Sequence, residues 1–551
     1  MIHEDAWRPA DGLVLEPNAL SAVKAETKSI ALTAGPGAGK TELLAQKADF
    51  LLRTGICRYP KRILAISFKV DASSNLRERV KRRCGVSLAS RFDSYTFHAF
   101  AKRIIDRFRP VLMGVDALNP DYTIGDHRIA KVQITFNDLV PLATEILQSS
   151  AVARNVVRQT YGQVFLDEFQ DCTKEQYKFI KVMFDGTPIP LTAVGDTKQR
   201  IMAWAGALEG IFVTFADDFQ ARPLNLYRNF RSQPQLLRMQ NRIIEVLDPA
   251  SVMPDELIKG DGGEIEIKTY DDEQSEAESL AAHIGRWLSE DQLSPAEVAL
   301  LVPRLAEQYC GALMTELHRC GIPFRNEQQL QDLSVEPLTR LIIDYLLVLF
   351  GSREPVAYTR LMELLTTASY GEEEDATLRN TWLNFLRSDK EKLAESQDQG
   401  FKSVWGYAEK LLSQIGEAQL VGLSPDYETK SRFEEVIEQV KSRLHALVAT
   451  EPDVHGALTR FGEDRAVRIM TIHKSKGLEF DSVIMLGVEE EAYWADPDEE
   501  RCLFFVGISR AKRRLILTHS ECRERPSGWT KMWHEGRTRH SEFLGYAEPF
   551  V

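Results

Sequence analysis

The stretch Ala34-Gly35-Pro36-Gly37-Ala38-Gly39-Lys40-Thr41 decides the fold, because it joins an apolar run to a helical one. Residues 30–33 before it suit a buried strand, and residues 42–47 after it suit the first turns of a helix. Glycines in such a turn let consecutive backbone N–H groups converge on phosphate oxygens, and the following helix directs its positive end at the same anion. The stretch therefore predicts a phosphate-binding loop between a strand and a helix.

Two side chains of this loop have predicted roles at a nucleoside triphosphate. Lys40 would bridge the β- and γ-phosphates, and the Thr41 hydroxyl would bind Mg²⁺. The general pattern G-x-x-x-x-G-K-[ST] has glycine where this chain has Ala34. A glycine-rich turn with an incidental lysine is the alternative that the loop alone leaves open.

The composition is that of a large, ordinary globular protein. At 551 residues the chain is longer than a single hydrophobic core can organise, so three or four domains are expected. The seven cysteines form no C-x-x-C pair and no Cys/His cluster, which argues against zinc and iron–sulfur sites and suits a reducing cytosol. The start lacks a signal pattern, and no apolar run reaches the roughly 18 residues of a membrane span. We expect a soluble, cytoplasmic protein with no membrane partner.

The net charge argues against a protein that coats nucleic acid by bulk electrostatics. It is −13, with a pI near 5.5. A local basic channel remains compatible with this balance, and residues 77–83, rich in arginine and lysine, are one candidate lining. The alternative for such a charge run is a solvated helix face.

Apolar β-type runs alternate with helical stretches through about the first 230 residues, which predicts an α/β fold with a parallel sheet. The expected strands are residues 30–34, 63–68, 163–167, 191–195 and 223–226. In such sheets, ligands lie beyond the carboxyl ends of the strands.

A second alternating region begins near Gly263, and a long helical stretch interrupts it. Its expected strands are residues 264–270, 298–302, 467–472, 482–486 and 515–518, with a helix at 274–288. The expected division is 1–100 and 161–222 for a first sheet domain, 101–160 for a small helical insertion, 223–329 and 463–551 for a second sheet domain, and 330–462 for a second helical insertion.

A pair of carboxylates follows one expected strand. Asp167 and Glu168 end the apolar run at residues 163–166, where an acidic side chain contributes nothing to packing. Asp167 could hold Mg²⁺, and Glu168 could polarise the water that attacks a γ-phosphate. The alternative is a strand end capped by solvated acids.

At these residues the chain resembles the superfamily 1 helicases of the UvrD/Rep type. Each of seven boxes after the phosphate loop is similar to a family motif, and they occur in the family's order. The boxes are residues 63–68 with Asp71, Ala72 and Arg79; 95–100; 167–171; 194–199 continuing to 204–207; 229–232; 471–480; and 506–511. Seven boxes in order are far more specific than any one.

The resemblance implies two RecA-like parallel-sheet motor domains, each with a largely helical inserted subdomain, and an ATP-dependent DNA helicase or translocase. The family moves 3′ to 5′ on single-stranded DNA and uses ATP with Mg²⁺. Single-stranded or partly duplex DNA is therefore the expected partner. Arginines from one motor domain would reach the nucleotide on the other, so that ATP closes the cleft and hydrolysis releases it.

Site residues follow by position in the motifs. The implied catalytic residues are Lys40, Asp167, Glu168, Gln199, Arg231 and Arg510. The implied ATP-binding residues are Ala34, Gly35, Gly37, Ala38, Gly39, Lys40, Thr41, Glu42, Phe230 and Glu479, with Thr41 and Asp167 at the metal. The implied DNA-binding residues are Phe68, His98, Trp204, His473 and Lys476. Lys476 and Glu479 resemble motif residues that also couple nucleotide to strand.

Three positions depart from the family pattern. Ala19 stands where a glutamine usually reads the adenine edge, and alanine cannot make those paired hydrogen bonds. Ala205 replaces an arginine in the W-R-G-A motif, and Lys47 replaces an arginine on the loop's helix. Selectivity for ATP over GTP is therefore in question.

A second function belongs to another class. The chain could be an ATP-gated DNA-binding regulatory subunit of a partner nuclease, without processive unwinding, and compact UvrD-like proteins also resemble the helicase component of Gabija-type phage-defence systems. A weaker third reading is a motor on RNA. DNA repair and phage defence are both compatible with the motifs.

Overall fold

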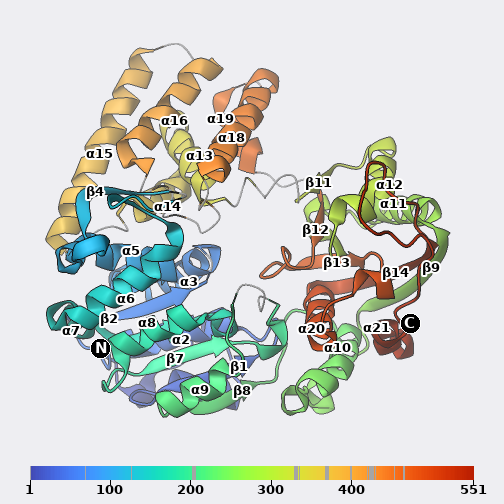
Figure 1. The fold of residues 1–551 in the computed structure, drawn as a ribbon, viewed down its shortest axis with the longest axis horizontal. Coiled ribbons are helices and arrows are strands. Elements are labelled where there is room, and N and C mark those ends of the chain that lie inside the picture. Colours follow the sequence, from blue (N-terminus) through green and yellow to red (C-terminus); the bar gives the residue numbers. More distant parts are fainter. Residues whose placement is uncertain are drawn as a thin grey trace.

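The computed structural model describes residues 2–551 except 69, 126, 202–205, 328–332, 334–335, 367–371, 397–399, 418–419, 421–422, 424–426, 428–429, 452 and 463–465. It contains two parallel six-stranded sheets, one in each of two lobes, and a block of helices (Figure 1). The predicted α/β class with two motor-type sheets is confirmed.

The first lobe is built on a sheet with the strand order β3-β2-β6-β7-β1-β8, in which every neighbouring pair is parallel. Its strands are β1 (Ile30–Ala34), β2 (Arg62–Ser67), β3 (Phe92–Thr96), β6 (Tyr161–Leu166), β7 (Leu191–Gly195) and β8 (Arg222–Leu226). Its helices are α1 (Pro17–Val23), α2 (Lys40–Arg53), α3 (Val70–Cys84), α4 (Val86–Ala89), α5 (Phe97–Phe108), α6 (Leu139–Ser149), α7 (Ala151–Thr160), α8 (Lys174–Phe184) and α9 (Ile211–Asp218).

Helices cover both faces of this sheet, which explains why most residues of its central strands β1, β2, β6 and β7 are buried. Successive side chains of β1 point to opposite faces: Leu32 belongs to the apolar cluster under α1, α2 and α3, whereas Ala31 belongs to the cluster under α5, α6 and α8. All carboxyl ends of the parallel strands therefore meet at one edge. The phosphate loop and the acidic pair follow β1 and β6 at that edge.

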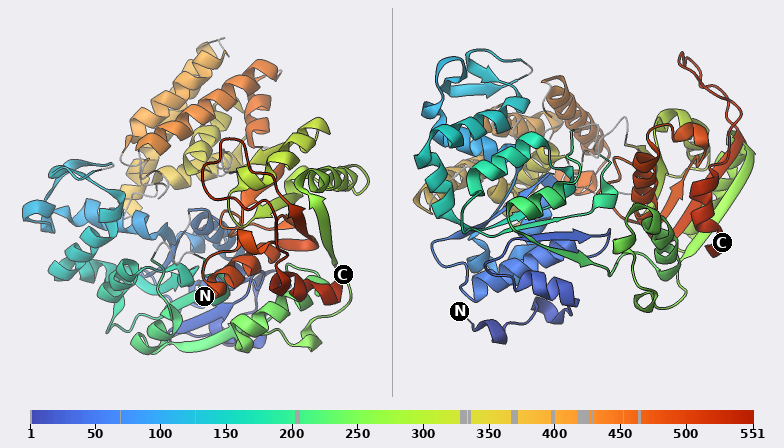
Figure 2. Two further views of the ribbon diagram at one scale, coloured as in Figure 1. Left: turned by 45° about the vertical axis from the view of Figure 1, so that its right-hand side comes forward. Right: turned by 60° about the horizontal axis from the view of Figure 1, so that its bottom comes forward.

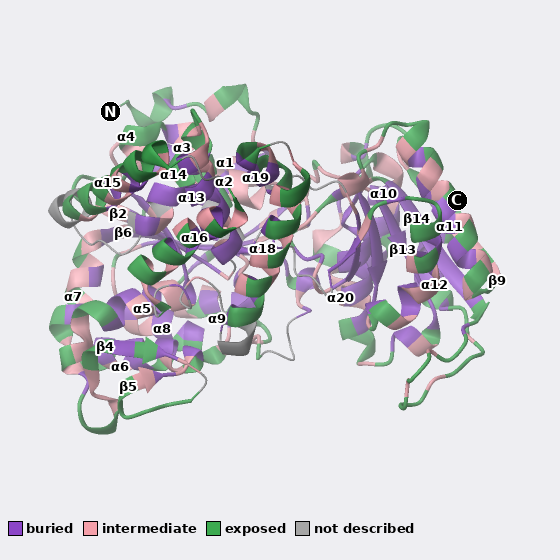
Figure 3. Cartoon of the chain, turned by 90° about the horizontal axis from the view of Figure 1, so that it is seen from above, coloured by how far each residue is buried: buried purple, intermediate pink, exposed green. Residues whose placement is uncertain are grey.

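The second lobe contains the sheet β11-β12-β10-β13-β14-β9, also parallel throughout. Figure 3 shows its strands largely buried between helices. The strands are β9 (Glu264–Asp272), β10 (Val298–Val302), β11 (Phe324–Asn326), β12 (Val467–Thr471), β13 (Phe480–Met485) and β14 (Ala511–Cys522). The helices are α10 (Pro234–Leu247), α11 (Glu273–Ser289), α12 (Ala306–Arg319), α20 (Pro497–Ile508) and α21 (Ser541–Ala547).

A helical block is inserted between β11 and β12. It consists of α13 (Pro337–Phe350), α14 (Pro355–Thr366), α15 (Glu372–Glu395), α16 (Phe401–Ile415), α18 (Lys430–Thr450) and α19 (Val454–Gly462). Although the chain enters it from the second lobe, the block stands over the first lobe (Figures 1 and 2). Its buried apolar side chains are continuous with the core beneath α5 and α6, whereas the second sheet has a separate core.

The structure differs from the sequence-based expectation at three places. Within residues 101–160, expected to be largely helical, β4 (Leu118–Ile124) and β5 (Lys131–Ile134) form a two-stranded parallel sheet that was not expected. Strands β3 and β11 were not expected. Strand β8 pairs with β1, so the first sheet extends past the boundary expected at residues 222–223. No helix in the described ranges combines the length and apolarity needed to cross a bilayer.

Candidate active site

The phosphate loop has the backbone that its glycines predict. Gly37 and Gly39 have φ of +70° and +81°, and α2 begins at Lys40. A Cβ at Gly37 would lie 2.4 Å from Asn229 Oδ1 and 2.6 Å from the Cβ of Arg231, so glycine is required there by space as well as by conformation. The Lys40 ammonium lies against its own loop, donating to the Ala34 carbonyl at 3.2 Å.

The two carboxylates at the end of β6 occupy different environments. Asp167 Oδ1 accepts the Glu168 N–H at 3.0 Å, and Glu168 has a left-handed backbone with φ of 49°. Burial, together with repulsion by Glu168, raises the pKa of Asp167 to about 7. Burial also favours protonation of Glu168, but attraction by Lys40 and Lys476 outweighs it and holds the pKa of Glu168 below its ordinary value. Glu168 is thus kept ionised.

The residues present fit a magnesium ion. Asp167 and Thr41 offer hard oxygen donors, and the raised pKa of Asp167 marks a carboxylate whose charge the protein leaves poorly compensated. Where the structure describes the chain, no group of three or more His, Cys, Asp or Glu side chains could enclose a metal. Proteins commonly hold Mg²⁺ through one or two carboxylates together with substrate phosphates, a role for which Asp167 has the required chemistry.

A chain of hydrogen bonds runs from Glu168 across to the second lobe. Gln170 Nε2 donates to Glu168 Oε2 at 2.7 Å, and Gln170 Oε1 accepts the Asp196 N–H at 2.9 Å. Gln199 Nε2 donates to Asp196 Oδ2 at 2.8 Å. Arg510 Nη2 then donates to Gln199 Oε1 at 2.8 Å. Gln199, predicted to be catalytic, therefore accepts a hydrogen bond from Arg510 of the second lobe and links the two lobes at this point.

The buried carboxylate in this chain is held ionised by a lysine. Lys198 Nζ lies 2.9 Å from Asp196 Oδ1, and both side chains are almost fully buried. Burial opposes ionisation of Asp196, but Lys198 and the Gln199 amide lower its pKa below the ordinary value. Because Asp196 stays ionised, its carboxylate accepts the Gln199 Nε2–H, and this bond holds the Gln199 amide in one orientation. Losing the partner would leave a buried charge unpaired, which is costly.

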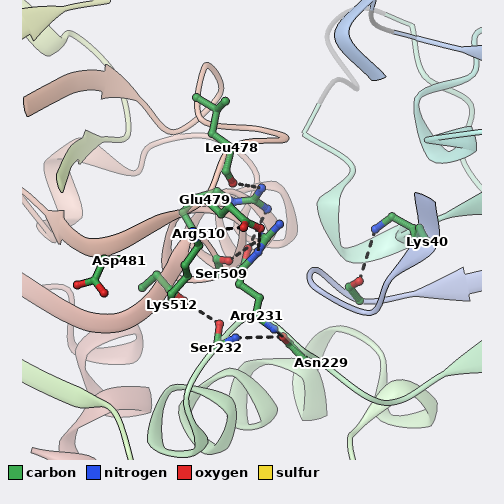
Figure 4. A network of polar contacts seen from close by, with 12 residues as sticks. Lys40, Asn229, Arg231, Ser232, Leu478, Glu479, Asp481, Ser509, Arg510 and Lys512 are labelled. Carbon is green, nitrogen blue, oxygen red and sulfur yellow. Dashed lines mark hydrogen bonds and ion pairs between the residues drawn. The ribbon is translucent and has the colours of Figure 1, made fainter. Parts of the chain in front are cut away.

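The two predicted arginine fingers lie together on the second lobe, facing the phosphate loop (Figure 4). Arg510 Nε donates to the Val506 carbonyl at 2.9 Å and Nη1 to the Leu478 carbonyl at 3.2 Å. Burial, with repulsion by Arg231, lowers the pKa of Arg510 to about 9, which still leaves it cationic at neutral pH.

Arg231 is oriented by contacts on both sides of its guanidinium. Its Nε donates to Glu479 Oε2 at 2.8 Å and its Nη1 to the Ser509 carbonyl at 3.0 Å. The Asn229 side chain accepts the N–H groups of Arg231 and Ser232, which fixes the turn. Glu479, predicted to bind ATP, is therefore engaged by Arg231 here, with Lys512 at 3.4 Å.

Phe230 and Ala19 are the two residues at the positions where the family is expected to contact the base. The Phe230 N–H donates to the Gly37 carbonyl at 2.9 Å, and its side chain is 68% exposed beside the phosphate loop. An exposed ring in this place is suited to stacking on a base. Ala19 is buried in α1. The nearby Glu16 carboxylate accepts the N–H groups of Tyr227 and Arg228, each at 3.3 Å.

Two of the predicted site residues, Glu42 and Lys476, are paired with opposite charges of this chain. Glu42 lies in the first turn of α2, but its carboxylate accepts two bonds from Arg83, at 2.8 and 3.0 Å, and one from Gln46. Lys476 is buried and binds Asp171 and the Gln199 carbonyl, so it connects the lobes here, and its role at a DNA strand stays a prediction. In both cases a nearby opposite charge satisfies the side chain.

The remaining predicted DNA residues follow strands at the carboxyl edges of the two sheets. Phe68 follows β2 and packs against Phe97 with ring centroids 5.3 Å apart. The ring centroids of His98 and Phe136 lie 4.1 Å apart, and burial lowers the pKa of His98 to about 4. His473 follows β12, and burial together with Arg304 lowers its pKa below the ordinary value. Trp204 lies outside the described residues.

Sequence reasoning gave no role to several residues that build the site. They are Gln170, Asp171, Asp196, Lys198 and Asn229. All five lie inside the motif boxes, so their positions carried a signal. Their partners are distant in sequence, which is why their roles were missed: Asp171 and Lys476, for example, are separated by 305 positions.

Two family models match the chain, one over each half. The UvrD/REP helicase N-terminal domain matches residues 15–134 and 124–220, and the UvrD-like helicase C-terminal domain matches residues 224–373 and 390–522. The chain is 24% identical to the ATP-dependent DNA helicase PcrA of Bacillus subtilis, over 92% of this chain and 83% of the relative. It is also 24% identical to the ATP-dependent DNA helicase Rep of Escherichia coli, over 93% and 91%.

Proposed function

Because the chain belongs to the UvrD-like helicase family, we propose that it is an ATP-dependent DNA helicase or translocase that moves 3′ to 5′ on single-stranded DNA. The relatives PcrA and Rep are named ATP-dependent DNA helicases. The observation that carries the proposal is the hydrogen-bond chain from Glu168 to Arg510, because it couples the predicted water-activating carboxylate of one lobe to a predicted arginine finger of the other.

In this proposal the phosphate loop holds ATP while charges surround its γ-phosphate. The Lys40 ammonium leaves its own loop carbonyl for the phosphates, and the ionised Glu168 accepts a proton from the attacking water. Thr41 and Asp167 would hold Mg²⁺, which neutralises phosphate charge when bound. Arg231 and Arg510 stabilise the charge that develops as the terminal phosphoanhydride bond breaks.

Movement would follow from the contacts that join the lobes. Arg510 and Lys476 reach the first lobe at Gln199 and Asp171 in the structure described here. A γ-phosphate draws Arg510 toward the phosphate loop, and its release frees that arginine again. Since each nucleotide state favours a different lobe arrangement, hydrolysis drives alternation between them.

The domain boundaries and the DNA path are also part of the proposal. We assign the motor to the two sheets, with the first ending at Leu226, and treat residues 101–160 and 330–462 as insertions. The proposed DNA path runs along the carboxyl edges of both sheets, past Phe68, His98 and His473. Selection between ATP and GTP would rest on base stacking more than on edge recognition, because position 19 is alanine.

The test is ATP hydrolysis by the pure chain with and without single-stranded DNA. We expect DNA to raise turnover, and Lys40→Ala or Glu168→Gln to abolish it. Absence of stimulation by DNA would refute a DNA-driven motor. Displacement of a terminal block from one end of a labelled strand, but not the other, tests polarity; ATP-dependent DNA binding without displacement would favour the regulatory subunit of a nuclease instead.

A further inference from the structure

A cavity on the first lobe has no part in the proposed motor. Its volume is about 640 Å³, and it lies beside α1, the loop at residues 24–28 and the first residues of β1 and β8, Ile30 and Arg222. Because these strands are parallel, their first residues mark the amino edge of the sheet, whereas the phosphate loop follows the carboxyl end of β1. A cavity of this volume is typical of small-molecule sites.

The cavity lies on the face of α1 that points away from the expected base position. Leu20, Ser21 and Lys24 follow one another at helical spacing and line the cavity. Ala19, at the expected base position, and Ala22 are buried on the other face of the helix. A ligand in the cavity would therefore be separated from the nucleotide by the helix itself.

Three cations surround the cavity. Lys24, Lys28 and Arg222 line it, and in the part of the chain that the structure describes none of them is paired with a carboxylate. The Arg222 guanidinium donates to Ser21 Oγ at 3.1 Å, and Thr27 contributes a second hydroxyl to the lining. Ammonium, guanidinium and hydroxyl groups are donors that proteins use to hold phosphate. The cavity therefore complements an anion with several acceptor oxygens.

The acidic residue in the lining, Glu26, is turned to another acid. Burial and a hydrogen bond shared with the Glu4 carboxyl raise the pKa of Glu26 above its ordinary value. A raised pKa reduces the negative charge that this side chain carries. Even when Glu26 is ionised, three cations face one carboxylate, so the cavity keeps a positive balance.

A buried lysine lies directly behind the wall of the cavity. Lys47 Nζ donates to the carbonyls of Ala22 and Ala25 at 2.6 and 2.8 Å, and Ala25 lines the cavity. The ammonium thus neutralises the negative end of α1, which would otherwise repel an anion. Burial lowers the pKa of Lys47 to about 7, although attraction by Glu26 opposes the shift. An anion in the cavity would stabilise this poorly compensated charge.

We propose that this cavity is a binding site for a phosphorylated small molecule, whose phosphate groups meet Lys24, Lys28 and Arg222 while its less polar part packs against Leu20. Three converging cations favour a multiply charged phosphate over a singly charged anion. The inference goes beyond the proposed function and does not depend on it, because the site contains no residue of the motor machinery.

Isothermal titration calorimetry with inorganic pyrophosphate, in magnesium-free buffer, tests this site. Every protein in the series carries Lys40→Ala, which removes the main phosphate contact of the nucleotide loop. Adding Lys24→Gln and Arg222→Gln should weaken pyrophosphate binding about ten-fold or more, because two charge-assisted contacts are lost. The matched control instead adds Lys174→Gln and Lys178→Gln, which remove two exposed lysines of α8 with the same change of charge, and it should bind as its parent.

A second variant blocks the cavity without changing its charge. Ser21 is half-buried on the face of α1 that lines the cavity, so Ser21→Tyr places a ring inside it. In the Lys40→Ala protein this change should remove most of the pyrophosphate affinity. The melting temperature should stay that of the parent, because the side chain lies at the surface of the helix.

Several outcomes would overturn the inference. They are absence of pyrophosphate binding by the Lys40→Ala protein, unchanged binding in the Lys24 and Arg222 variant, and unchanged binding in Ser21→Tyr, which would show that the cations attract the anion without a built site. Equal affinity for citrate would overturn the assignment to phosphate. None of these measurements involves DNA or ATP turnover, so failure of this inference and failure of the proposed function are distinguishable.

Discussion

The Nζ atom of Lys476 lies 2.8 and 2.7 Å from the two carboxylate oxygens of Asp171, so a buried ion pair joins the second lobe to the first. Removing the lysine would leave the Asp171 charge uncompensated in a poorly solvated place. We expect Lys476→Met to lower the free energy of unfolding by about 3 kcal/mol and to abolish DNA-stimulated turnover. Urea unfolding and steady-state ATP hydrolysis measure the two effects.

The control for this prediction is a lysine in a weaker pair. Lys512 Nζ lies 3.4 Å from Glu479, and its side chain is 34% exposed. Lys512→Met should therefore cost at most about 1 kcal/mol. Combining Lys476→Met with Asp171→Asn should cost less than the sum of the single changes, because the two groups are coupled. Additive effects would show that the ion pair does not act as a unit.

Arg510 should be intolerant even of lysine. Its planar guanidinium donates at once to Gln199, to Ser509 Oγ at 2.9 Å and to main-chain carbonyls, an arrangement that a single ammonium cannot reproduce. We expect Arg510→Lys to reduce kcat at least about a hundred-fold, with ATP affinity changed only a few-fold. Single-turnover hydrolysis and equilibrium nucleotide binding separate these quantities. Arg513→Lys, an exposed change on β14, which begins directly after Arg510, is the control and should behave as wild type.

The sequence predicted most of the two sheets because their strands are buried on both faces. The run of β10 is apolar throughout, that of β1 is apolar except for Thr33, and loop signals bound both, so their type and limits were evident. Strand β4 was missed because most of its side chains are exposed or half-buried, which leaves little alternation to detect. Strand β11 has only three residues, too short for any periodic signal.

The candidate site was predictable in its residue types and not in its pairings. The glycines and the acidic pair carry chemistry that is local in sequence, and the motif order associates them with distant arginines. The pairings depend on how segments that are distant in sequence approach one another in the fold. Examples are the ion pair of Lys476 with Asp171 and that of Arg83 with Glu42. Nothing in the spacing of charged residues specifies such contacts.

His98 should make the stability of the protein sensitive to mildly acidic pH. Burial lowers its pKa to about 4, compared with about 6.5 in an unfolded chain, so the unfolded state binds the proton more readily. The contribution of His98 is fully present above pH 6.5 and is lost as the pH falls toward 4. His98→Gln should therefore reduce the fall in melting temperature between pH 6.5 and 4. The exposed His127→Gln is the control, and an identical pH profile for wild type and His98→Gln would contradict the prediction.

Two glycines of the phosphate loop should respond differently to the same substitution. Gly37 has φ of +70°, and a Cβ there would overlap Asn229 and Arg231 on the segment that carries an arginine finger. A Cβ at Gly35 would meet no atom of the described residues within 4 Å. We expect Gly37→Ala to destabilise the protein by about 1–3 kcal/mol through backbone strain, with further loss of ATP hydrolysis as Arg231 is displaced. Gly35→Ala should keep the wild-type melting temperature. Thermal unfolding of both variants, without nucleotide, decides the matter: equal melting temperatures would show that the loop does not depend on the close approach of residues 229–231.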